Sequence, residues 1–366
     1  MKIELDHEKL RYSGRIDDRN PKRPEFIFPA SYLAFRFQGT AAWVTVENRR
    51  GCWDNYLGII LDGKQWKVKL PDEGEMRICL GENLGDVPHE VMVFKRQDAC
   101  HEYALTGLEL SEESRLLEPP ERPARRIEVF GDSVSAGEVS EAVDYVGKPD
   151  PEHSGEYSNS WYSYSWIAAR RLGAELHDTA QGGIALMDGT GWFCDPVFPG
   201  MESCWDKVHY NPALGPATDW DFKRYRPHVV VAAIGQNDSH PEDYMKEDPE
   251  GKKAKRWKAV YRQWIEALRK TYPRAAIVLT TTILCHDPSW DKAIHQVWEE
   301  LGDERIYHFL YSENGSGTPG HIRIPEAERM AEELSGFIES LPEEIWLDEP
   351  EENEKERSAY ERKMAV

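Results

Sequence analysis

Two short and almost wholly apolar segments constrain the fold of this chain more than any other feature of its sequence. Residues 228–234 read HVVVAAI, and residues 275–280 read AAIVLT. A strand that is apolar on both faces is typical of a parallel sheet covered by helices on both sides. Apolar residues with helical spacing occur in three stretches, 161–172, 256–272 and the segment that opens at Ile324-Pro325. Alternating strands and helices predict an α/β domain with a parallel sheet over residues 127–341.

The first part of the chain has a different pattern, in which short β-rich runs are separated by turn signals such as Asp62-Gly63. The clearest runs are 32–37, 42–46, 56–61 and 90–95. Several short strands with a turn roughly every ten residues predict a β-sandwich. Charged residues and the prolines 119, 120 and 123 then mark an extended connector. The predicted organisation is a β-sandwich domain (1–115), a linker (116–126), an α/β domain (127–341) and a charged C-terminal tail (342–366).

The composition argues against several classes of protein. Its 45 basic and 66 acidic residues give a formal net charge of −21, which repels nucleic acid phosphates and anionic lipid. No apolar run approaches the ~18 residues of a membrane-spanning helix. Residues 1–7 lack the apolar region of a signal peptide, and the six cysteines show no CxxC spacing. We therefore expect a cytoplasmic protein with free thiols, unless a leader precedes the sequence, and neither nucleic acid nor a membrane as its partner.

A serine directly follows the first predicted strand of the α/β domain. Residues 127–130 are apolar apart from Glu128 and run into Gly131-Asp132-Ser133. Ligands of open α/β sheets bind at the carboxyl ends of the strands, where a serine on a tight turn is placed like a nucleophile. A serine at such a position is also a common helix N-cap, so this motif alone leaves both interpretations open.

Three further motifs follow at other predicted strand or loop ends. Gly183 lies in Gln181-Gly182-Gly183, where a glycine allows a backbone N–H to face a ligand. Asn237 follows the strand 228–234 and can offer a side-chain N–H to an oxyanion, or it can form a turn. His321 precedes the last predicted helix and is one of 12 histidines.

Together and in this order, the four motifs resemble those of the SGNH (GDSL-type) hydrolase superfamily. Gly131-Asp132-Ser133, Gly183, residues 235–238 and His321 are similar to its first, second, third and fifth blocks. The N-terminal part resembles the jelly-roll domain that precedes the catalytic domain in carbohydrate esterase family 2. Its similar segments are Gly14-Arg15, Phe28–Ser31, Phe35–Thr40, Leu61–Gly63, Gly85 with His89, and Phe94–Arg96. The resemblance implies a jelly-roll domain followed by a flavodoxin-like three-layer SGNH domain.

The resemblance also implies a mechanism. Ser133 would attack an acetyl carbonyl while His321 takes its proton, and water would then hydrolyse the acetyl-enzyme. The oxyanion hole would consist of the Ser133 N–H, the Gly183 N–H and the Asn237 side chain. Such a reaction needs no metal and no organic cofactor. His286 and His295, with Asp287 and Asp291, fit no standard metal spacing and are expected on a surface helix.

One position departs from the superfamily pattern. Members usually carry Asp three residues before the histidine, whereas this chain has Thr318 there. Threonine cannot stabilise an imidazolium by charge. Two arrangements therefore stay open: a Ser–His dyad oriented by a backbone carbonyl, as in some members of this esterase family, or a carboxylate from elsewhere in the chain.

Aromatic residues are frequent between the second and third blocks. They are Trp192, Phe193, Phe198, Trp205, Tyr210 and Trp220. Each could pack under a long loop or stack on a sugar ring. Trp192 is the first candidate for a sugar platform, because it comes soon after the glycine block.

The leading hypothesis is an esterase that removes O-acetyl groups from plant-derived acetylated xylo- or manno-oligosaccharides. One alternative is an SGNH esterase or lipase of broader specificity. Another is a non-catalytic carbohydrate-binding protein, which the loss of Asp at position 318 would favour. The expected partner is the oligosaccharide, and exposed strand edges leave a homo-oligomer open.

Overall fold

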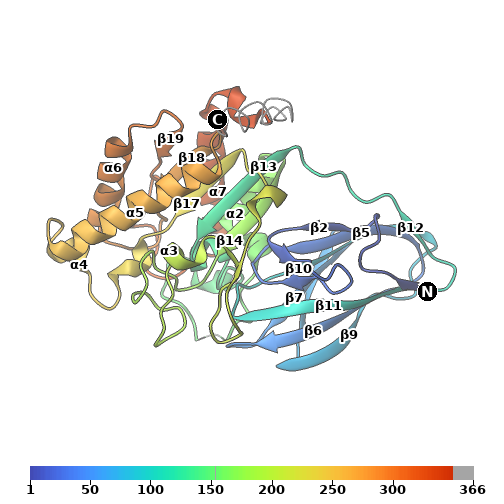
Figure 1. Cartoon of the computed structure of the whole chain (residues 1–366). Helices are drawn as coiled ribbons and strands as arrows, with labels where there is room; N and C mark the ends of the chain where they lie inside the picture. Colours follow the sequence, from blue (N-terminus) through green and yellow to red (C-terminus); the bar gives the residue numbers. More distant parts are fainter. Residues whose placement is uncertain (153, 349–366) are drawn as a thin grey trace, which may run out of the picture.

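The computed structural model describes residues 1–152 and 154–348. The N-terminal third folds into antiparallel sheets, and the remainder forms a parallel sheet with helices (Figure 1). Across the described ranges, none of the helices has the length and apolarity needed to cross a bilayer. The predicted combination of a β-sandwich with an α/β domain is confirmed.

Two antiparallel sheets face each other in the N-terminal domain. One has the order β3-β4-β11-β6-β9 with β1 added on β11, and the other has the order β12-β5-β10-β7-β8 with β2 added on β5. The first sheet comprises β1 (Lys2–Ile3), β3 (Ile16–Asp17), β4 (Glu25–Phe26), β6 (Ala42–Arg50), β9 (Glu73–Gly81) and β11 (His101–Leu110). The second comprises β2 (Arg11–Ser13), β5 (Tyr32–Gly39), β7 (Tyr56–Leu61), β8 (Lys64–Lys69), β10 (Val87–Lys95) and β12 (Arg115–Leu117).

The core of the sandwich comes from the inward side chains of both sheets. Along β6 buried residues alternate with partly exposed ones, which is the period of a strand with one face toward a core. Phe35, Val44, Leu57, Val91 and Leu105 are fully buried in this cluster. The four β-rich runs seen in the sequence are therefore the centres of β5, β6, β7 and β10.

The α/β domain has a five-stranded parallel sheet in the order β14-β13-β17-β18-β19. Its strands are β13 (Arg125–Gly131), β14 (Ala174–Ala180), β17 (Val229–Ala233), β18 (Ala276–Thr280) and β19 (Ile306–His308). Numbered from β13, this is the flavodoxin-like order 2-1-3-4-5. The strand order reverses between β13 and β17, so the carboxyl ends of these two strands form the switch point where ligands of such sheets bind.

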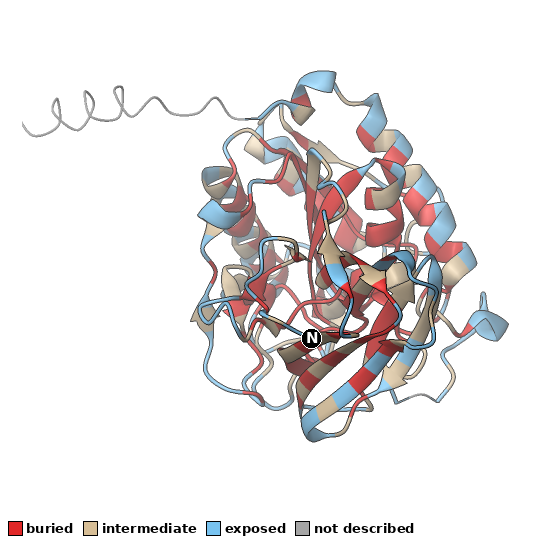
Figure 2. Cartoon of the chain, turned by 90° about the vertical axis from the view of Figure 1, so that its right-hand side faces the viewer, coloured by how far each residue is buried: buried red, intermediate tan, exposed pale blue. Residues whose placement is uncertain are grey.

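Helices cover both faces of this sheet, and its strands β14, β17 and β18 are buried along their whole length (Figure 2). α2 (Tyr164–Arg171) and α7 (Ile324–Ser340) pack with Val129 and Val231 on one face. α5 (Lys252–Thr271) and α6 (Ser289–Leu301) pack with Val230 and Leu279 on the other. Burial on both faces explains why residues 229–233 and 276–280 carry almost no polar side chain.

A buried ion pair joins the two domains. Arg15 of the sandwich domain and Glu128 of β13 are both fully buried, and Arg15 Nη2 lies 2.9 Å from Glu128 Oε1. Arg15 Nη1 also donates to the carbonyl of Trp205 at 2.6 Å. The sandwich domain is therefore packed against the edge of the α/β domain near β13 and β14. At the other end of the chain, residues 343–346 form a 3-10 turn with Ile345 buried, and residues 349–366 of the predicted tail lie outside the described residues.

Candidate active site

Ser133 lies at the switch point, directly after β13. Asp132 caps the short helix α1 (Ser133–Ala136), because its carboxylate accepts a hydrogen bond from the Val134 N–H at 3.0 Å. The same carboxylate accepts from Gln236 Nε2 at 2.7 Å. Asp132 thus ties the serine turn to the loop after β17.

The serine and the histidine meet, although 188 residues separate them. His321 Nε2 lies 2.8 Å from Ser133 Oγ, within hydrogen-bond distance for proton transfer. His321 comes just before α7, whose first turn contains Pro325, so the rigid start of this helix fixes the position of the ring. The sequence expectation that these two side chains lie together agrees with this geometry.

The other ring nitrogen of His321 faces a carboxylate that the sequence analysis did not single out. Asp150 Oδ2 lies 2.6 Å from His321 Nδ1, and Asp150 Oδ1 accepts from the His321 backbone N–H at 2.9 Å. The buried guanidinium of Arg323 donates to Oδ1 at 2.8 Å. The three side chains Ser133, His321 and Asp150 therefore form the geometry of a Ser-His-Asp triad.

The charges of this triad support one another. Burial raises the pKa of Asp150, but His321 and Arg323 outweigh it and lower the pKa to about 2. Burial lowers the pKa of His321, but the carboxylates of Glu138, Asp150 and Asp132 outweigh it and raise the pKa above its ordinary value. Asp150 is therefore ionised at neutral pH and stabilises an imidazolium at His321.

Thr318 has no part in orienting the histidine. Its side chain is buried, and its hydroxyl has no hydrogen-bond partner among the described residues. Of the two arrangements that the sequence left open, the structure has the carboxylate from elsewhere in the chain. No signal in the sequence marked Asp150, because it lies in a loop with no periodicity and meets His321 only through the fold.

The loop that carries Asp150 rests on the sandwich domain. The Asp54 N–H donates to the carbonyl of Ser154 at 2.7 Å. Ser160 Oγ donates to the carbonyl of Lys95 at 2.7 Å, and the Ser160 N–H donates to the carbonyl of Arg96 at 2.8 Å. Lys67 of β8 also donates to the carbonyl of Glu156, so residues after Asp150 are held by three separate segments of the N-terminal domain.

Two backbone N–H groups are available beside the serine. Among the hydrogen bonds of the described residues, neither the Ser133 N–H nor the Gly183 N–H has an acceptor. Gly183 has a φ of 72°, and a Cβ there would lie 2.8 Å from the Cβ of Trp192. Only glycine fits this conformation and this space. Asn237 Nδ2 donates to the carbonyl of Ile184 at 3.0 Å and to Asp132 Oδ2 at 3.2 Å, so both hydrogens of this amide are engaged and it is held between the serine turn and the glycine loop.

Carboxylates from both domains fix the glycine loop. Asp98 of the sandwich domain accepts from the Gly182 N–H at 2.6 Å and from Gln181 Nε2 at 2.9 Å. On the other side, Asp238 accepts from the N–H groups of Leu186 at 2.7 Å and Met187 at 3.1 Å. The contribution of Asp98 was not foreseen, because nothing in its sequence surroundings links it to the second block.

Trp192 is the exposed member of the aromatic insert. Its side chain is 62% exposed, whereas Phe193, Tyr210 and Trp220 are buried. One face of the indole stacks on His240, with ring centroids 3.4 Å apart and an angle of 21° between the planes. The Trp192 N–H donates to the carbonyl of Gly183 at 2.8 Å. An exposed aromatic ring therefore stands beside the glycine of the candidate oxyanion hole.

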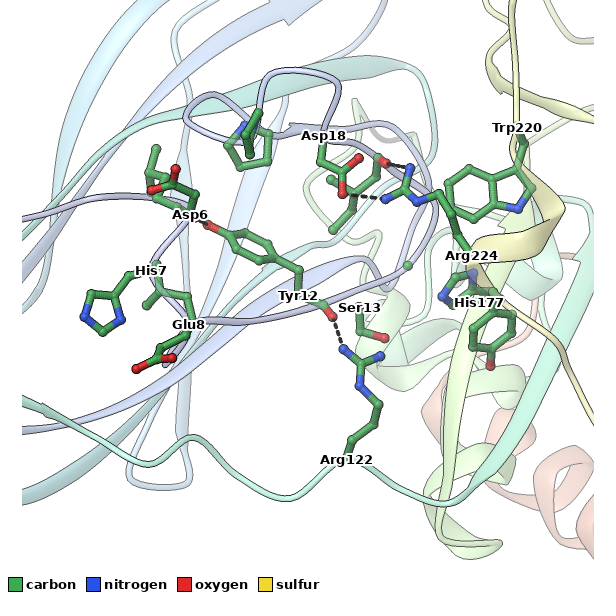
Figure 3. A pocket seen from close by; sticks show the side chains of 17 residues that line it. Asp6, His7, Glu8, Tyr12, Ser13, Asp18, Arg122, His177, Trp220 and Arg224 are labelled. Atoms are coloured by element: carbon green, nitrogen blue, oxygen red, sulfur yellow. Dashed lines mark hydrogen bonds and ion pairs between the residues drawn. The ribbon is translucent and has the colours of Figure 1, made fainter. Parts of the chain in front are cut away.

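A separate cavity lies at the junction of the two domains (Figure 3). It measures about 410 Å³, and none of Ser133, Gly183, Asn237 and His321 lines it. Its two arginines are engaged: Arg122 pairs with Glu175, and Arg224 pairs with Asp18 at 2.7 Å. We assign no chemistry to this cavity.

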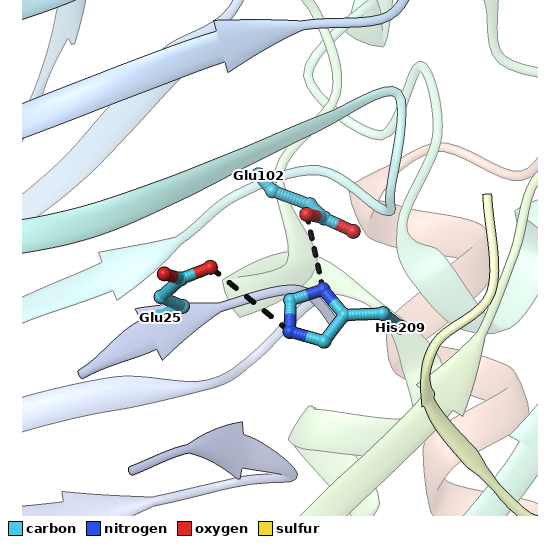
Figure 4. Close-up of side chains that lie close together, drawn as sticks. All are labelled: Glu25, Glu102 and His209. Carbon is cyan, nitrogen blue, oxygen red and sulfur yellow. Dashed lines mark hydrogen bonds and ion pairs between the residues drawn. The ribbon is translucent and has the colours of Figure 1, made fainter. Parts of the chain in front are cut away.

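A second cluster, around His209, contains side chains of the kind that ligate metals (Figure 4). His209 Nδ1 lies 3.1 Å from Glu102, and Nε2 lies 3.0 Å from Asp17 and 4.0 Å from Glu25. Each carboxylate already has an arginine partner, because Asp17 pairs with Arg19, Glu25 with Arg23 and Glu102 with Arg49. The cluster is therefore a balanced ion network between the domains.

His286 also differs from its predicted environment. The sequence analysis placed it on a surface helix, but its side chain is only 4% exposed and it precedes α6. Its Nε2 lies 3.1 Å from Asp291 Oδ2, and its Nδ1 lies 2.7 Å from the carbonyl of Leu284. The prediction of a surface position was wrong, because the loop after β18 turns inward beneath Asn314, whose amide donates to Asp291 at 2.9 Å.

Comparison with known proteins gives consistent matches over most of the chain. The family model "Carbohydrate esterase 2 N-terminal" matches residues 12–120. The chain is 26% identical over 347 residues to the cellulase/esterase CelE of Acetivibrio thermocellus, a match that covers 92% of this chain and 40% of that protein. It is 27% identical over 356 residues to an acetylxylan esterase / glucomannan deacetylase of Cellvibrio japonicus, covering 91% of this chain and 88% of that protein.

A solved structure agrees with these relatives. A family two carbohydrate esterase from Clostridium thermocellum, in complex with cellohexaose, matches with a TM-score of 0.75 and 25% identity. The match covers 92% of this chain and 100% of that chain, so it includes both the sandwich and the α/β domain. The family model, the relatives and the solved structure agree with one another, and this chain is therefore similar to family two carbohydrate esterases over both its sandwich and its α/β domain.

Proposed function

We propose that this protein is a serine esterase that removes O-acetyl groups from acetylated xylo- or manno-oligosaccharides of plant origin. The observation that carries the proposal is the alignment of Ser133 Oγ, the His321 imidazole and the Asp150 carboxylate, with contacts of 2.8 and 2.6 Å. The substrate class is supported by the relatives, one of which is named an acetylxylan esterase / glucomannan deacetylase.

In the first half of the proposed reaction, Ser133 Oγ attacks the acetyl carbonyl carbon while His321 Nε2 accepts the hydroxyl proton. The imidazolium that forms is stabilised by Asp150 at Nδ1. The developing oxyanion would accept from the N–H groups of Ser133 and Gly183, and from the amide of Asn237 once one of its hydrogens turns from Asp132 to the oxyanion. The proton then passes from Nε2 to the sugar oxygen as the ester bond breaks.

In the second half, a water molecule attacks the acetyl-serine. His321 accepts one of its protons, the tetrahedral intermediate collapses, and this proton passes to Ser133 Oγ as acetic acid leaves and then ionises. None of these steps calls for a metal or an organic cofactor.

The sugar is proposed to lie against the free face of Trp192. The other face of this indole is covered by His240, so the ring is held in one orientation before the substrate arrives. A rigid, exposed aromatic ring gives contact area to a sugar at little cost in conformational entropy. Its contact with the Gly183 loop would place the bound sugar next to the acetyl group under attack.

The test of the proposal has two parts. Wild type and Ser133→Ala are compared for release of 4-nitrophenol from 4-nitrophenyl acetate, and activity is expected only in wild type. Acetylated xylan and glucomannan fragments are then followed by NMR, where loss of acetyl signals identifies the sugar and the position. Equal release by both proteins would overturn the esterase assignment. Binding of the fragments without release would favour a carbohydrate-binding protein, and faster turnover of long acyl esters would favour a broader esterase or lipase.

A further inference from the structure

A second carboxylate stands beside the histidine, on the side where the reaction takes place. Glu138 Oε2 lies 3.9 Å from His321 Nε2, the same nitrogen that faces Ser133 Oγ at 2.8 Å. Asp150, by contrast, contacts Nδ1 on the opposite side of the ring. Glu138 is therefore placed to act on whatever group occupies Nε2 after the serine has been acylated.

The backbone holds Glu138 in this position. α1 ends at Gly137, whose φ of 76° turns the chain back toward the serine. The Glu138 N–H then donates to the carbonyl of Ser133 at 3.0 Å. Glu138 is 8% exposed. Its position is thus tied directly to the nucleophile rather than to a surface loop.

The glycine block leaves room for this carboxylate. A Cβ at position 182 would lie 2.7 Å from Glu138 Oε2 and 2.7 Å from Asp98 Oδ2. Asp98 Oδ2 already accepts from the N–H of Gly182 and the side chain of Gln181, so it is committed to holding the loop. Of the two carboxylates that Gly182 accommodates, Glu138 is the one that faces the imidazole.

The separation of Glu138 Oε2 and His321 Nε2 suits a bridging water. Two polar atoms 3.9 Å apart can both be reached by one water molecule at ordinary hydrogen-bond distances of about 2.8 Å. We propose, on the basis of the esterase function proposed above, that Glu138 is a further catalytic residue, which holds the attacking water of the deacylation step at His321 Nε2.

The chemistry of this step balances. The water oxygen forms a bond to the acetyl carbon, one of its protons passes to His321 Nε2, and its other hydrogen stays hydrogen-bonded to Glu138. When the intermediate collapses, the bond between the acetyl carbon and Ser133 Oγ breaks and His321 returns the proton to Oγ. Acetic acid forms and then ionises, and Glu138 ends the cycle unchanged.

The charges around Glu138 fit a role near neutral pH. Burial raises the pKa of Glu138 to about 7, with His321 lowering it and Asp98, Asp150 and Asp132 raising it. A carboxylate with such a pKa gains its charge in the same pH range in which a histidine becomes a base. The acceptor for the water and the base that activates it are thus present together.

The experiment separates acylation from deacylation in the full-length protein. Stopped-flow release of 4-nitrophenol from 4-nitrophenyl acetate gives the acylation rate from the burst and the deacylation rate from the steady state. Glu138→Gln keeps the shape but removes the charge, and Glu138→Ala removes the acceptor. Both are expected to slow deacylation roughly 10- to 100-fold, with a much smaller effect on acylation. The acetyl adduct on Ser133 should accumulate and be visible by intact-protein mass spectrometry.

Asp144→Asn is the matched control, because Asp144 is an exposed acidic residue six positions further along the chain. It should leave both rates at their wild-type values. The proposal fails if the Glu138 variants slow both steps equally, or neither, while wild type shows a burst that depends on Ser133. Absence of Ser133-dependent turnover in wild type would instead overturn the esterase function itself. A burst of normal rate in the variants also demonstrates that they are folded.

Discussion

Asp150 Oδ2 lies 2.6 Å from His321 Nδ1, across 171 residues of sequence. This contact supplies the charge that the residue three positions before the histidine, Thr318, cannot supply. A histidine held in this way keeps its Nε2 free to exchange a proton with the serine. The role of Asp150 can be tested directly by substitution.

Asp150→Asn keeps the size of the side chain but replaces the acceptor by an amide that can donate to Nδ1 and select the wrong tautomer. The expected result is a loss of kcat of about 10⁴-fold, the size of the effect of this change in a Ser-His-Asp triad. Steady-state hydrolysis of 4-nitrophenyl acetate measures it. A variant with nearly full activity would mean that the protein works as a Ser–His dyad.

The pH dependence of kcat/KM should follow the histidine. His321 must be neutral to act as a base, and its pKa is raised above the usual value of about 6.5 by Glu138, Asp150 and Asp132 against the effect of burial. Activity should therefore rise with pH through a midpoint above 6.5. Removal of a negative charge lowers the pKa of the imidazole, so Glu138→Gln should move this midpoint to lower pH. An unchanged or upward-shifted midpoint would contradict the electrostatic link.

The amide of Asn237 is expected to contribute to the rate and little to substrate affinity. Replacement of one oxyanion-hole donor typically lowers kcat by about 10²- to 10³-fold. Asn237→Ala should show this loss with KM nearly unchanged, as measured with an acetylated oligosaccharide. Since the amide also bonds the carbonyl of Ile184, the melting temperature is recorded in parallel. A fall in melting temperature without a fall in kcat would assign Asn237 a structural role only.

Trp192→Ala tests the sugar platform. Aromatic stacking contributes about 0.5–1.5 kcal/mol, so KM for acetylated oligosaccharides should rise roughly two- to tenfold. Hydrolysis of 4-nitrophenyl acetate, which has no sugar, should keep its wild-type rate. Trp205→Ala would not serve as a control for this test, because Trp205 packs on Phe222 and its removal would disturb that contact. Among the ring contacts of the described residues, Trp192 contacts only His240. If Trp192→Ala impairs hydrolysis of the oligosaccharide and of 4-nitrophenyl acetate equally, Trp192 acts by holding the Gly183 loop and not by binding the sugar.

The ion network at His209 should make the stability of the protein depend on pH. Burial lowers the pKa of His209, but hydrogen bonds with Glu102 and Asp17 outweigh it and raise the pKa above its ordinary value. Because the folded-state pKa is raised, the stabilisation is complete below the unfolded value of about 6.5 and is lost as pH rises through the folded value. Glu25, Glu47, Arg19, Arg23 and Arg49 are the other charged groups of this network.

His209→Gln should therefore lower the free energy of unfolding by about 1–3 kcal/mol at pH 6 and by less at pH 9. Thermal unfolding of both proteins at the two pH values measures the difference. A destabilisation of equal size at both values would mean that His209 is neutral in the folded protein and contributes by packing alone.

The elements that could be predicted from the sequence are those whose environment is uniform along the chain. β17 and β18 are buried on both faces, so their residues are apolar without interruption. β9 was missed because most of its residues are exposed and its sequence, EGEMRICLG, is not a hydrophobic run. Its first half carries the charged residues Glu73, Glu75 and Arg77. Its place in the sheet is decided by pairing with β6, which a local pattern cannot reveal.

The site residues also fall into those that a local sequence motif marks and those that only the fold brings to the site. Ser133, Gly183, Asn237 and His321 each sit at the end of a strand or the start of a helix, where a short motif marks them. Asp98, Glu138 and Asp150 have no such mark. Asp98 reaches the site from a loop of the sandwich domain, so only the packing of the two domains brings it there. Glu138 and Asp150 reach the site through the turn after α1 and the loop before α2.

The support of the Asp150 loop by Asp54, Lys95 and Arg96 has a consequence for protein engineering. An excised α/β domain would retain Ser133, His321 and Gly183, yet the loop bearing Asp150 would lose its bonds to Asp54, Lys95 and Arg96, and Gly182 would lose its bond to Asp98. Such a truncation is expected to leave a poorly assembled catalyst rather than a minimal one. The sandwich domain therefore holds loops of the reactive centre in place, and the sandwich and α/β domains would have to be transferred together.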